Sequence, residues 1–111
     1  MLPRSQKINT QLFKKVLLEG KNYNFVYFSV KKLRILEESK NKFAFVISKK
    51  ILKKAVERNL IKRRFFNLIK TICPENLETS AIIFFCKKGV EKLDFGDLKK
   101  EIANILEKLV K

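Results

Sequence analysis

The chain has 111 residues, of which 26 are Lys or Arg and 11 are Asp or Glu, so its formal net charge at pH 7 is +15. Hydrophobic residues make up 46% of the chain, which excludes a disordered basic tail and predicts one folded domain over residues 1–111. No apolar run reaches the length of a membrane span. The charge favours nucleic acid as the partner over an anionic membrane, because the basic residues do not gather on one amphipathic segment.

The first expected element is a helix that ends near Glu19. Asn9 or Thr10 can cap its start, because a side-chain oxygen there accepts a hydrogen bond from a free N–H group of the first turn. Gly20 is the expected stop. The apolar stripe of this helix consists of Leu12, Phe13, Val16 and Leu17.

Residues typical of β-strands follow. The segment Phe25–Leu36 is rich in them, and Lys31 and Lys32 can mark a bend between two strands. A turn is expected over Glu38–Asn41, and Phe43–Ser48 is a short, mostly apolar strand.

A long helix is expected over Ala55–Ile72, after the basic connection Lys49–Lys54. Cys73 ends it, because the residue before a proline is disfavoured in the α region. The almost wholly apolar segment Ala81–Cys86 predicts a buried central strand.

The last expected helix has Asp94 as its cap and ends near Val110. Its inward row consists of Leu98, Ile102, Ile105 and Leu109. The order is therefore helix, strands, helix, strand, helix. This order predicts an α/β (α+β) two-layer sandwich with a mixed sheet of about four strands.

Protein-based catalysis at neutral pH has little support in the sequence, because the chain contains no His. Asp94, Asp97 and Glu101 come closest to an acidic cluster, and the acidic start of a helix explains them better. Cys73 and Cys86 are expected to be reduced core thiols, since two Cys without His cannot complete a zinc site. With no apolar signal segment after Met1, we expect a cytoplasmic protein without catalytic residues, metal site or bound cofactor.

The segment Ser48–Arg64 is the most informative part of the chain. One face of the expected helix is apolar and should contact the sheet: Ile61, Phe65, Leu68 and Ile72. The opposite side carries Asn59, Lys62, Arg63, Phe66 and Lys70. Such a rigid row of donors can bind phosphates, because Arg pairs with phosphate bidentately and Lys acts as a point charge. A solvated basic face is the alternative.

The run Lys53–Arg63, Lys-Lys-Ala-Val-Glu-Arg-Asn-Leu-Ile-Lys-Arg, closely resembles the signature of the bacterial ribonuclease P protein component. Ser48–Lys50 matches the strand end that leads into this signature. Phe13–Gly20 resembles the first helix of the family, Ile82–Gly89 its apolar strand and basic turn, and Leu93–Leu98 the start of its last helix. The resemblance therefore extends over nearly the whole chain.

The resemblance implies a left-handed crossover around the signature helix, although right-handed crossovers are the general rule. It also implies a protein that binds the catalytic RNA of ribonuclease P and assists the removal of the 5′ leader from precursor tRNA. The RNA would perform the magnesium-dependent hydrolysis. The residues expected on the catalytic RNA are Lys49, Lys50, Lys53, Lys54, Arg58, Asn59, Lys62 and Arg63.

A cleft between the first helix and the sheet is implied for the single-stranded leader. Phe13 and Phe28 match family positions in that cleft, where an aromatic ring can stack on an unpaired base. Core packing is the alternative for both residues, and it is the favoured one for Phe28.

Three positions depart from the family pattern. Leu60 and Phe66 replace arginines, and Arg64 replaces an apolar residue. The contact at Leu60 is therefore in doubt, and Arg64 can compensate for it in part. Phe66 either stacks on a nucleotide or, as we favour, covers the edge of the core. A structural ribosomal-RNA-binding protein and a stand-alone nuclease are the alternative functions.

Overall fold

The computed structural model describes residues 7–35, 41–73, 77 and 79–110. Its elements confirm the expected order of helix, strands, helix, strand, helix. They are α1 (Thr10–Glu19), β1 (Lys21–Asn24), β2 (Phe28–Arg34), β3 (Lys42–Val46), α2 (Ala55–Ile72), β4 (Ser80–Cys86), the 3-10 turn η2 (Val90–Lys92) and α3 (Phe95–Val110).

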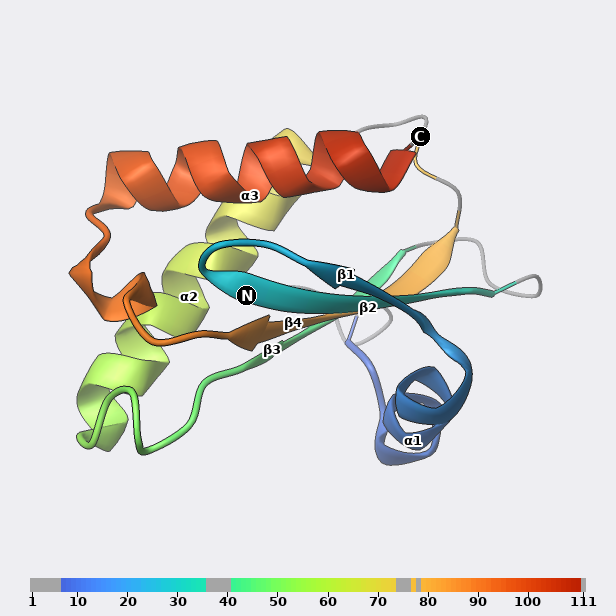
Figure 1. Cartoon of the computed structure of the whole chain (residues 1–111), viewed down its shortest axis with the longest axis horizontal. Helices are drawn as coiled ribbons and strands as arrows, with labels where there is room; N and C mark the ends of the chain where they lie inside the picture. The colour runs from blue at the N-terminus through green and yellow to red at the C-terminus, as the bar shows by residue number, and fades with distance from the viewer. Residues whose placement is uncertain (1–6, 36–40, 74–76, 78, 111) are drawn as a thin grey trace.

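The four strands form one mixed sheet in the order β1-β2-β4-β3 (Figure 1). The pairs β1–β2 and β2–β4 are antiparallel, whereas β3 and β4 run parallel, with Val46 opposite Phe85. Helix α2 makes the connection between these two parallel strands, and β3 forms an edge of the sheet. The left-handed sense of this crossover stays a prediction from the resemblance.

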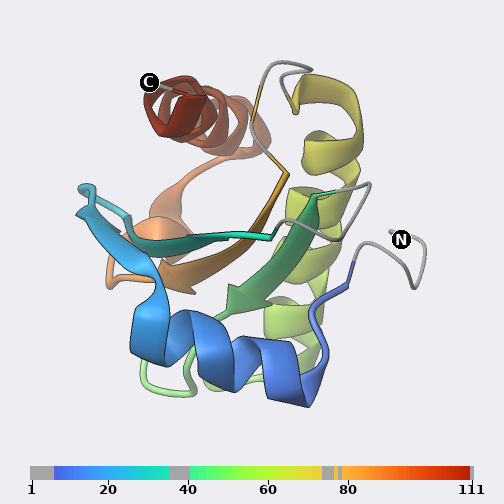
Figure 2. The same ribbon diagram turned by 90° about the vertical axis from the view of Figure 1, so that its right-hand side faces the viewer.

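Helices cover both faces of the sheet (Figures 1 and 2). Because successive side chains of a strand point to opposite faces, β4 contributes to two cores. Ile82 and Phe84 join the large core under α2 and α3, whereas Ala81 and Ile83 join a small core with Val16 of α1. The expected sandwich therefore has a third, thinner layer that consists of α1.

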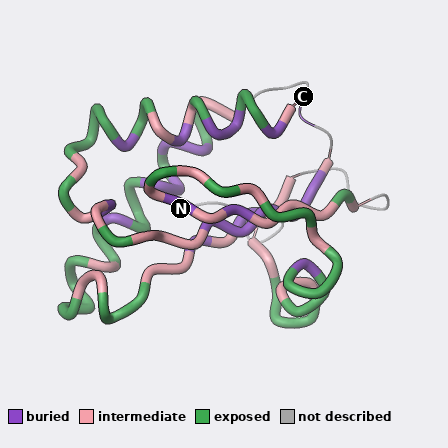
Figure 3. Tube along the Cα trace, in the orientation of Figure 1, coloured by how far each residue is buried: buried purple, intermediate pink, exposed green. Residues whose placement is uncertain are grey.

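Aromatic rings link α2 to the sheet in the large core, which runs through the middle of the molecule (Figure 3). Phe65 is fully buried, and its ring centroid lies 4.6 Å from that of Phe45 and 4.8 Å from that of Phe84. The inward row expected for α3 is buried as well. Helix α2 is thus held rigidly against the sheet, with its other side free to present polar groups.

Capping residues place the first and last helices as the sequence predicts. Asn9 is the N-cap of α1, and its Oδ1 accepts a hydrogen bond of 2.8 Å from the N–H of Leu12. Asp94 precedes α3, and its Oδ1 accepts one of 2.8 Å from the N–H of Asp97. The acidic start expected for α3 is therefore confirmed.

The bend expected at Lys31 and Lys32 is wrong, because both residues lie inside the continuous strand β2. Neighbouring residues of a strand point to opposite faces, and each lysine reaches the end of a different helix. Lys31 Nζ donates to Leu17 O of α1 at 2.8 Å, and Lys32 Nζ to Leu109 O of α3 at 2.9 Å. A cation at a helix C-terminus is favourable, which explains two lysines within a strand.

The turn between the first two strands lies instead between Asn24 and Phe28, and the polar segment Lys21–Asn24 forms β1. The turn expected over Glu38–Asn41 lies, apart from Asn41, outside the described residues.

Candidate nucleic-acid interface

The loop from Ser48 to Lys54, here called the lysine loop, joins β3 to α2. It begins with a turn in which Ser48 O accepts hydrogen bonds from the N–H groups of Ile51 and Leu52, at 3.1 and 3.2 Å. Those two apolar side chains pack against the large core. Its four lysines are exposed: Lys49, Lys50, Lys53 and Lys54. The loop therefore has an apolar anchor and a cationic surface.

Arg58, one turn into α2, is tied to this loop. Its Nη1 donates hydrogen bonds to Leu52 O and Lys53 O, both at 2.7 Å, and the residue is half-buried. Of the residues predicted to contact RNA, Arg58 is thus the one whose side chain has a defined intramolecular role.

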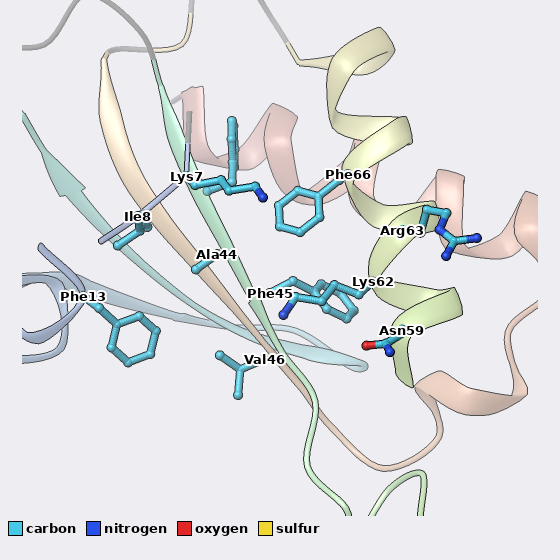
Figure 4. Close-up of a pocket in the computed structure, with 11 residues that line it drawn as sticks. Lys7, Ile8, Phe13, Ala44, Phe45, Val46, Asn59, Lys62, Arg63 and Phe66 are labelled. Carbon is cyan, nitrogen blue, oxygen red and sulfur yellow. The ribbon is translucent and has the colours of Figure 1, made fainter. Parts of the chain in front are cut away.

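The exposed side of α2 carries Asn59, Lys62 and Arg63 beside the buried Ile61 and Phe65, as the helical spacing predicts. Neither Lys62 nor Arg63 forms an ion pair with a carboxylate of the described residues. The side chain of Lys62 extends over β3, whereas the guanidinium of Arg63 points away from the sheet (Figure 4). Successive residues lie about 100° apart around a helix, so the side chains of Lys62 and Arg63 point in different directions.

A groove of about 640 Å³ runs over the edge strand β3, between α1 and α2 (Figure 4). Phe13 forms the wall on the side of α1, and its ring meets Phe85 edge-to-face at 6.3 Å. Asn59, Lys62 and Phe66 form the opposite wall. The remaining lining residues are Lys7, Ile8, Phe43, Ala44, Phe45, Val46 and Arg63. The groove therefore has an aromatic ring on each wall and a cation on the α2 wall.

Phe28 does not belong to this groove. It is fully buried in the large core, where its ring lies 5.7 Å from Phe84 and 6.3 Å from Phe45. Its side chain lies on the face of the sheet that α2 and α3 cover, with Val30 and Phe84. Phe28 therefore packs in the core, which is the alternative that its sequence position favours, and its ring does not line the groove.

Phe66 is 5% exposed, and its ring packs against Phe65 at 5.3 Å, so it covers the edge of the core as we favoured. Its ring also points into the groove (Figure 4). Ala44 and Val46 also line the groove and are not among the residues predicted for the site; both lie on the α1 side of β3. Strand alternation could have identified them, since Phe43 and Phe45 take the other face.

Both cysteines are free thiols and half-buried. Burial raises the pKa of Cys86 to about 12. Burial also raises the pKa of Cys73, against a smaller lowering by its hydrogen bond with Asn41. Both thiols are therefore protonated at neutral pH, which makes them poor nucleophiles and poor metal ligands.

Two further properties concern only the part of the chain that the structure describes. In that part, no three Cys, Asp or Glu side chains gather into a group that could hold a metal ion. None of its helices is long and apolar enough to cross a membrane.

Solved structures share this fold. The ribonuclease P protein of Staphylococcus aureus, in a mutant with defective mRNA degradation activity, aligns with a TM-score of 0.84 over 95% of this chain and 88% of that chain, at 19% identity. The ribonuclease P protein of Thermotoga maritima aligns with a TM-score of 0.77 over 92% of this chain and 96% of that chain, at 21% identity. These likenesses define the class of fold, which is the α+β fold of ribonuclease P proteins.

Sequence comparison establishes the family. The family model for ribonuclease P matches residues 2–110. The ribonuclease P protein component of Rickettsia bellii is 36% identical, with 88% of each chain aligned, and that of Streptococcus mutans is 32% identical over 86% of this chain and 77% of the relative. The chain belongs to the ribonuclease P protein family. Membership favours the role of ribonuclease P subunit over that of a structural ribosomal-RNA-binding protein.

Proposed function

We propose that this chain binds the catalytic RNA of ribonuclease P with its lysine loop and the exposed side of α2, and the 5′ leader of precursor tRNA in the groove. One observation carries the proposal: exposed cations extend from the loop along α2 and border a groove whose far wall is Phe13. In this arrangement, one helix serves two RNA surfaces.

The catalytic RNA would contact the outward cations. Phe65 packs the inner face of α2 against the sheet. The cations on α2 therefore project from an ordered helix and lose less conformational entropy on binding than those of a flexible tail would. Leu60 is 44% exposed and offers no donor. Arg64, one helical turn further along, is exposed and offers a cation on the same side.

The leader would occupy the groove. Phe13 can stack on an unpaired base with little sequence preference, while Lys62 on the opposite wall can meet the phosphate backbone. Because the rings that line the groove offer stacking rather than base-edge hydrogen bonds, the groove fits single strands of varied sequence.

Hydrolysis itself is assigned to the RNA subunit, with magnesium as its metal. The chain contains no His, and its two thiols have raised pKa values, so this protein supplies binding and positioning. The free thiols also fit a reducing compartment, and we place the protein in the cytoplasm.

Reconstitution with the cognate catalytic RNA at low magnesium tests the proposed function. We expect cleavage of precursor tRNA to require the RNA and to accelerate when the protein is added. Cleavage by the purified protein alone would instead identify a stand-alone nuclease. Recovery of ribosomal RNA, rather than one abundant non-ribosomal RNA and tRNA precursors, after pull-down from cells would also overturn the proposal.

Replacement of Phe13 by Ala tests the leader groove. Loss of one stacked base should weaken the binding of precursor tRNA to the reconstituted enzyme about 5- to 150-fold, equivalent to about 1–3 kcal/mol. Mature tRNA, which lacks the leader, should bind as before. Leu17→Ala is the matched control, because Leu17 is a partly exposed residue of α1 that does not line the groove.

Phe13 also packs on Phe85, so thermal unfolding of both variants must accompany the binding measurements. Equal losses for precursor and mature tRNA, with the fold intact, would contradict the assignment of the groove to the leader.

A further inference from the structure

We infer that Arg58 is a positioning residue that holds the lysine loop in the shape in which it meets RNA. This inference rests on the proposed function and assigns different roles to the cations within it. Lys62 and Arg63 would act through direct contacts, whereas Arg58 would act through the loop lysines.

The contacts of Arg58 support this role. Both hydrogen bonds of its Nη1 end on consecutive carbonyl oxygens of the loop, Leu52 O and Lys53 O, at 2.7 Å. The backbone N–H of Arg58 donates to Lys54 O at 3.2 Å. One residue is thus bonded to three successive residues of the loop, and each bond to the guanidinium is charge-assisted and stronger than a neutral one.

The start of α2 lacks a side-chain cap, so the hydrogen bonds of Arg58 are important there. Lys54 is the N-cap residue, and its side chain makes no capping hydrogen bond. A Ser, Thr, Asp or Asn at this position would usually fix the entry of the chain into the helix. In this protein the guanidinium of Arg58, from within the helix, fixes the last residues of the loop instead.

Repulsion among the loop lysines makes the hydrogen bonds of Arg58 more important. Four exposed lysines lie within six residues, from Lys49 to Lys54, and like charges repel one another and favour an open loop. The anchors Ile51 and Leu52 are only partly buried. Without Arg58, we expect the loop to sample many conformations, so that its lysines must be ordered when RNA binds.

The RNA-free protein allows a first measurement. In Arg58→Ala, a lysine-specific protease should cleave after Lys53 or Lys54 at least about tenfold faster than in the wild type, because local opening exposes the backbone. Arg63→Ala is the matched control: it removes the same side chain from the same helix, but Arg63 makes no contact with the loop carbonyls. Its cleavage rate should stay at the wild-type value.

RNA binding gives the second measurement. Arg63→Ala should weaken binding of the cognate catalytic RNA about tenfold, as expected for one charge-assisted contact. Arg58→Ala should weaken it about fiftyfold, because several lysines lose their ordered positions. Adding Lys50→Ala should then cost less in the Arg58→Ala protein than in the wild type, since contacts that share a support are not additive.

Arg58→Lys separates charge from shape. A lysine keeps the positive charge but loses the planar guanidinium group, and its Nζ lies one bond closer to the backbone than Nη1 of arginine. Positioning predicts that this variant remains more sensitive to the protease than the wild type. A purely electrostatic role predicts wild-type cleavage and wild-type RNA affinity.

The inference is overturned if wild-type protein binds the RNA while Arg58→Ala matches Arg63→Ala in both cleavage rate and affinity. If the wild type fails to bind the catalytic RNA at all, the proposed function is wrong instead. The protease experiment, which uses no RNA, then still reports on the loop.

Discussion

Simultaneous replacement of Lys50, Lys53 and Arg63 by Ala is expected to lower the affinity for the catalytic RNA about 1,000-fold at constant salt, roughly tenfold per lost charge-assisted contact. All three side chains are exposed, and none forms an ion pair with a described carboxylate. Their removal should therefore leave the fold intact and remove only contacts with the partner. Filter binding or fluorescence anisotropy with the cognate RNA measures the change.

A second triple variant controls for net charge. Lys99, Lys100 and Lys108 are exposed residues of α3, which lies outside the lysine loop and α2. Their replacement by Ala removes the same three charges and should change the affinity by less than about fivefold, because these residues lie outside the proposed interface and salt screens the attraction between separated exposed charges. Equal losses in the two triple variants would show that only total charge matters, against a defined interface.

Phe65→Ala is expected to lower the free energy of unfolding by about 3–5 kcal/mol, the usual loss when a buried Phe is truncated. Phe65 is fully buried and touches Phe45, Phe66 and Phe84. The cavity would open between α2 and the sheet, where the helix that carries the cations is held. Denaturant titration followed by circular dichroism measures this loss.

Phe95 supplies the control for this substitution, since it is 49% exposed at the start of α3. Phe95→Ala should change the free energy of unfolding by no more than about 0.5 kcal/mol. If Phe65→Ala costs less than about 1 kcal/mol, the packing of α2 against the sheet is not what keeps the cations in place.

Local signals in the sequence were sufficient to find the helices. Asn9 and Asp94 have the chemistry of N-caps, and a proline after Cys73 in the sequence predicts a helix end there, so α1, α2 and α3 lie where expected. The hairpin was harder, because Lys31 and Lys32 resemble a polar break. Their partners are carbonyl oxygens at the ends of α1 and α3, far away in sequence for Lys32, so no local pattern reveals them.

In the candidate site too, some features follow from local sequence patterns and others depend on the folded structure. Exposure of the cations follows from helical spacing, because Ile61 and Phe65 fix which side of α2 is buried. The resemblance left two roles open for Phe28, because it aligns positions along the chain and does not by itself give the face of the sheet. The bonds of Arg58 depend on the shape of the lysine loop, and two residues of that loop, Ile51 and Leu52, pack against a core built from distant segments.

The salt dependence of RNA binding tests the central claim most directly. For the wild type, the logarithm of the association constant should fall with the logarithm of salt concentration by about 0.7–0.9 for each phosphate neutralised. The triple variant of Lys50, Lys53 and Arg63 should show a slope shallower by roughly 2–3, since about three such contacts are lost. Equal slopes for the two proteins would contradict an interface formed by these cations.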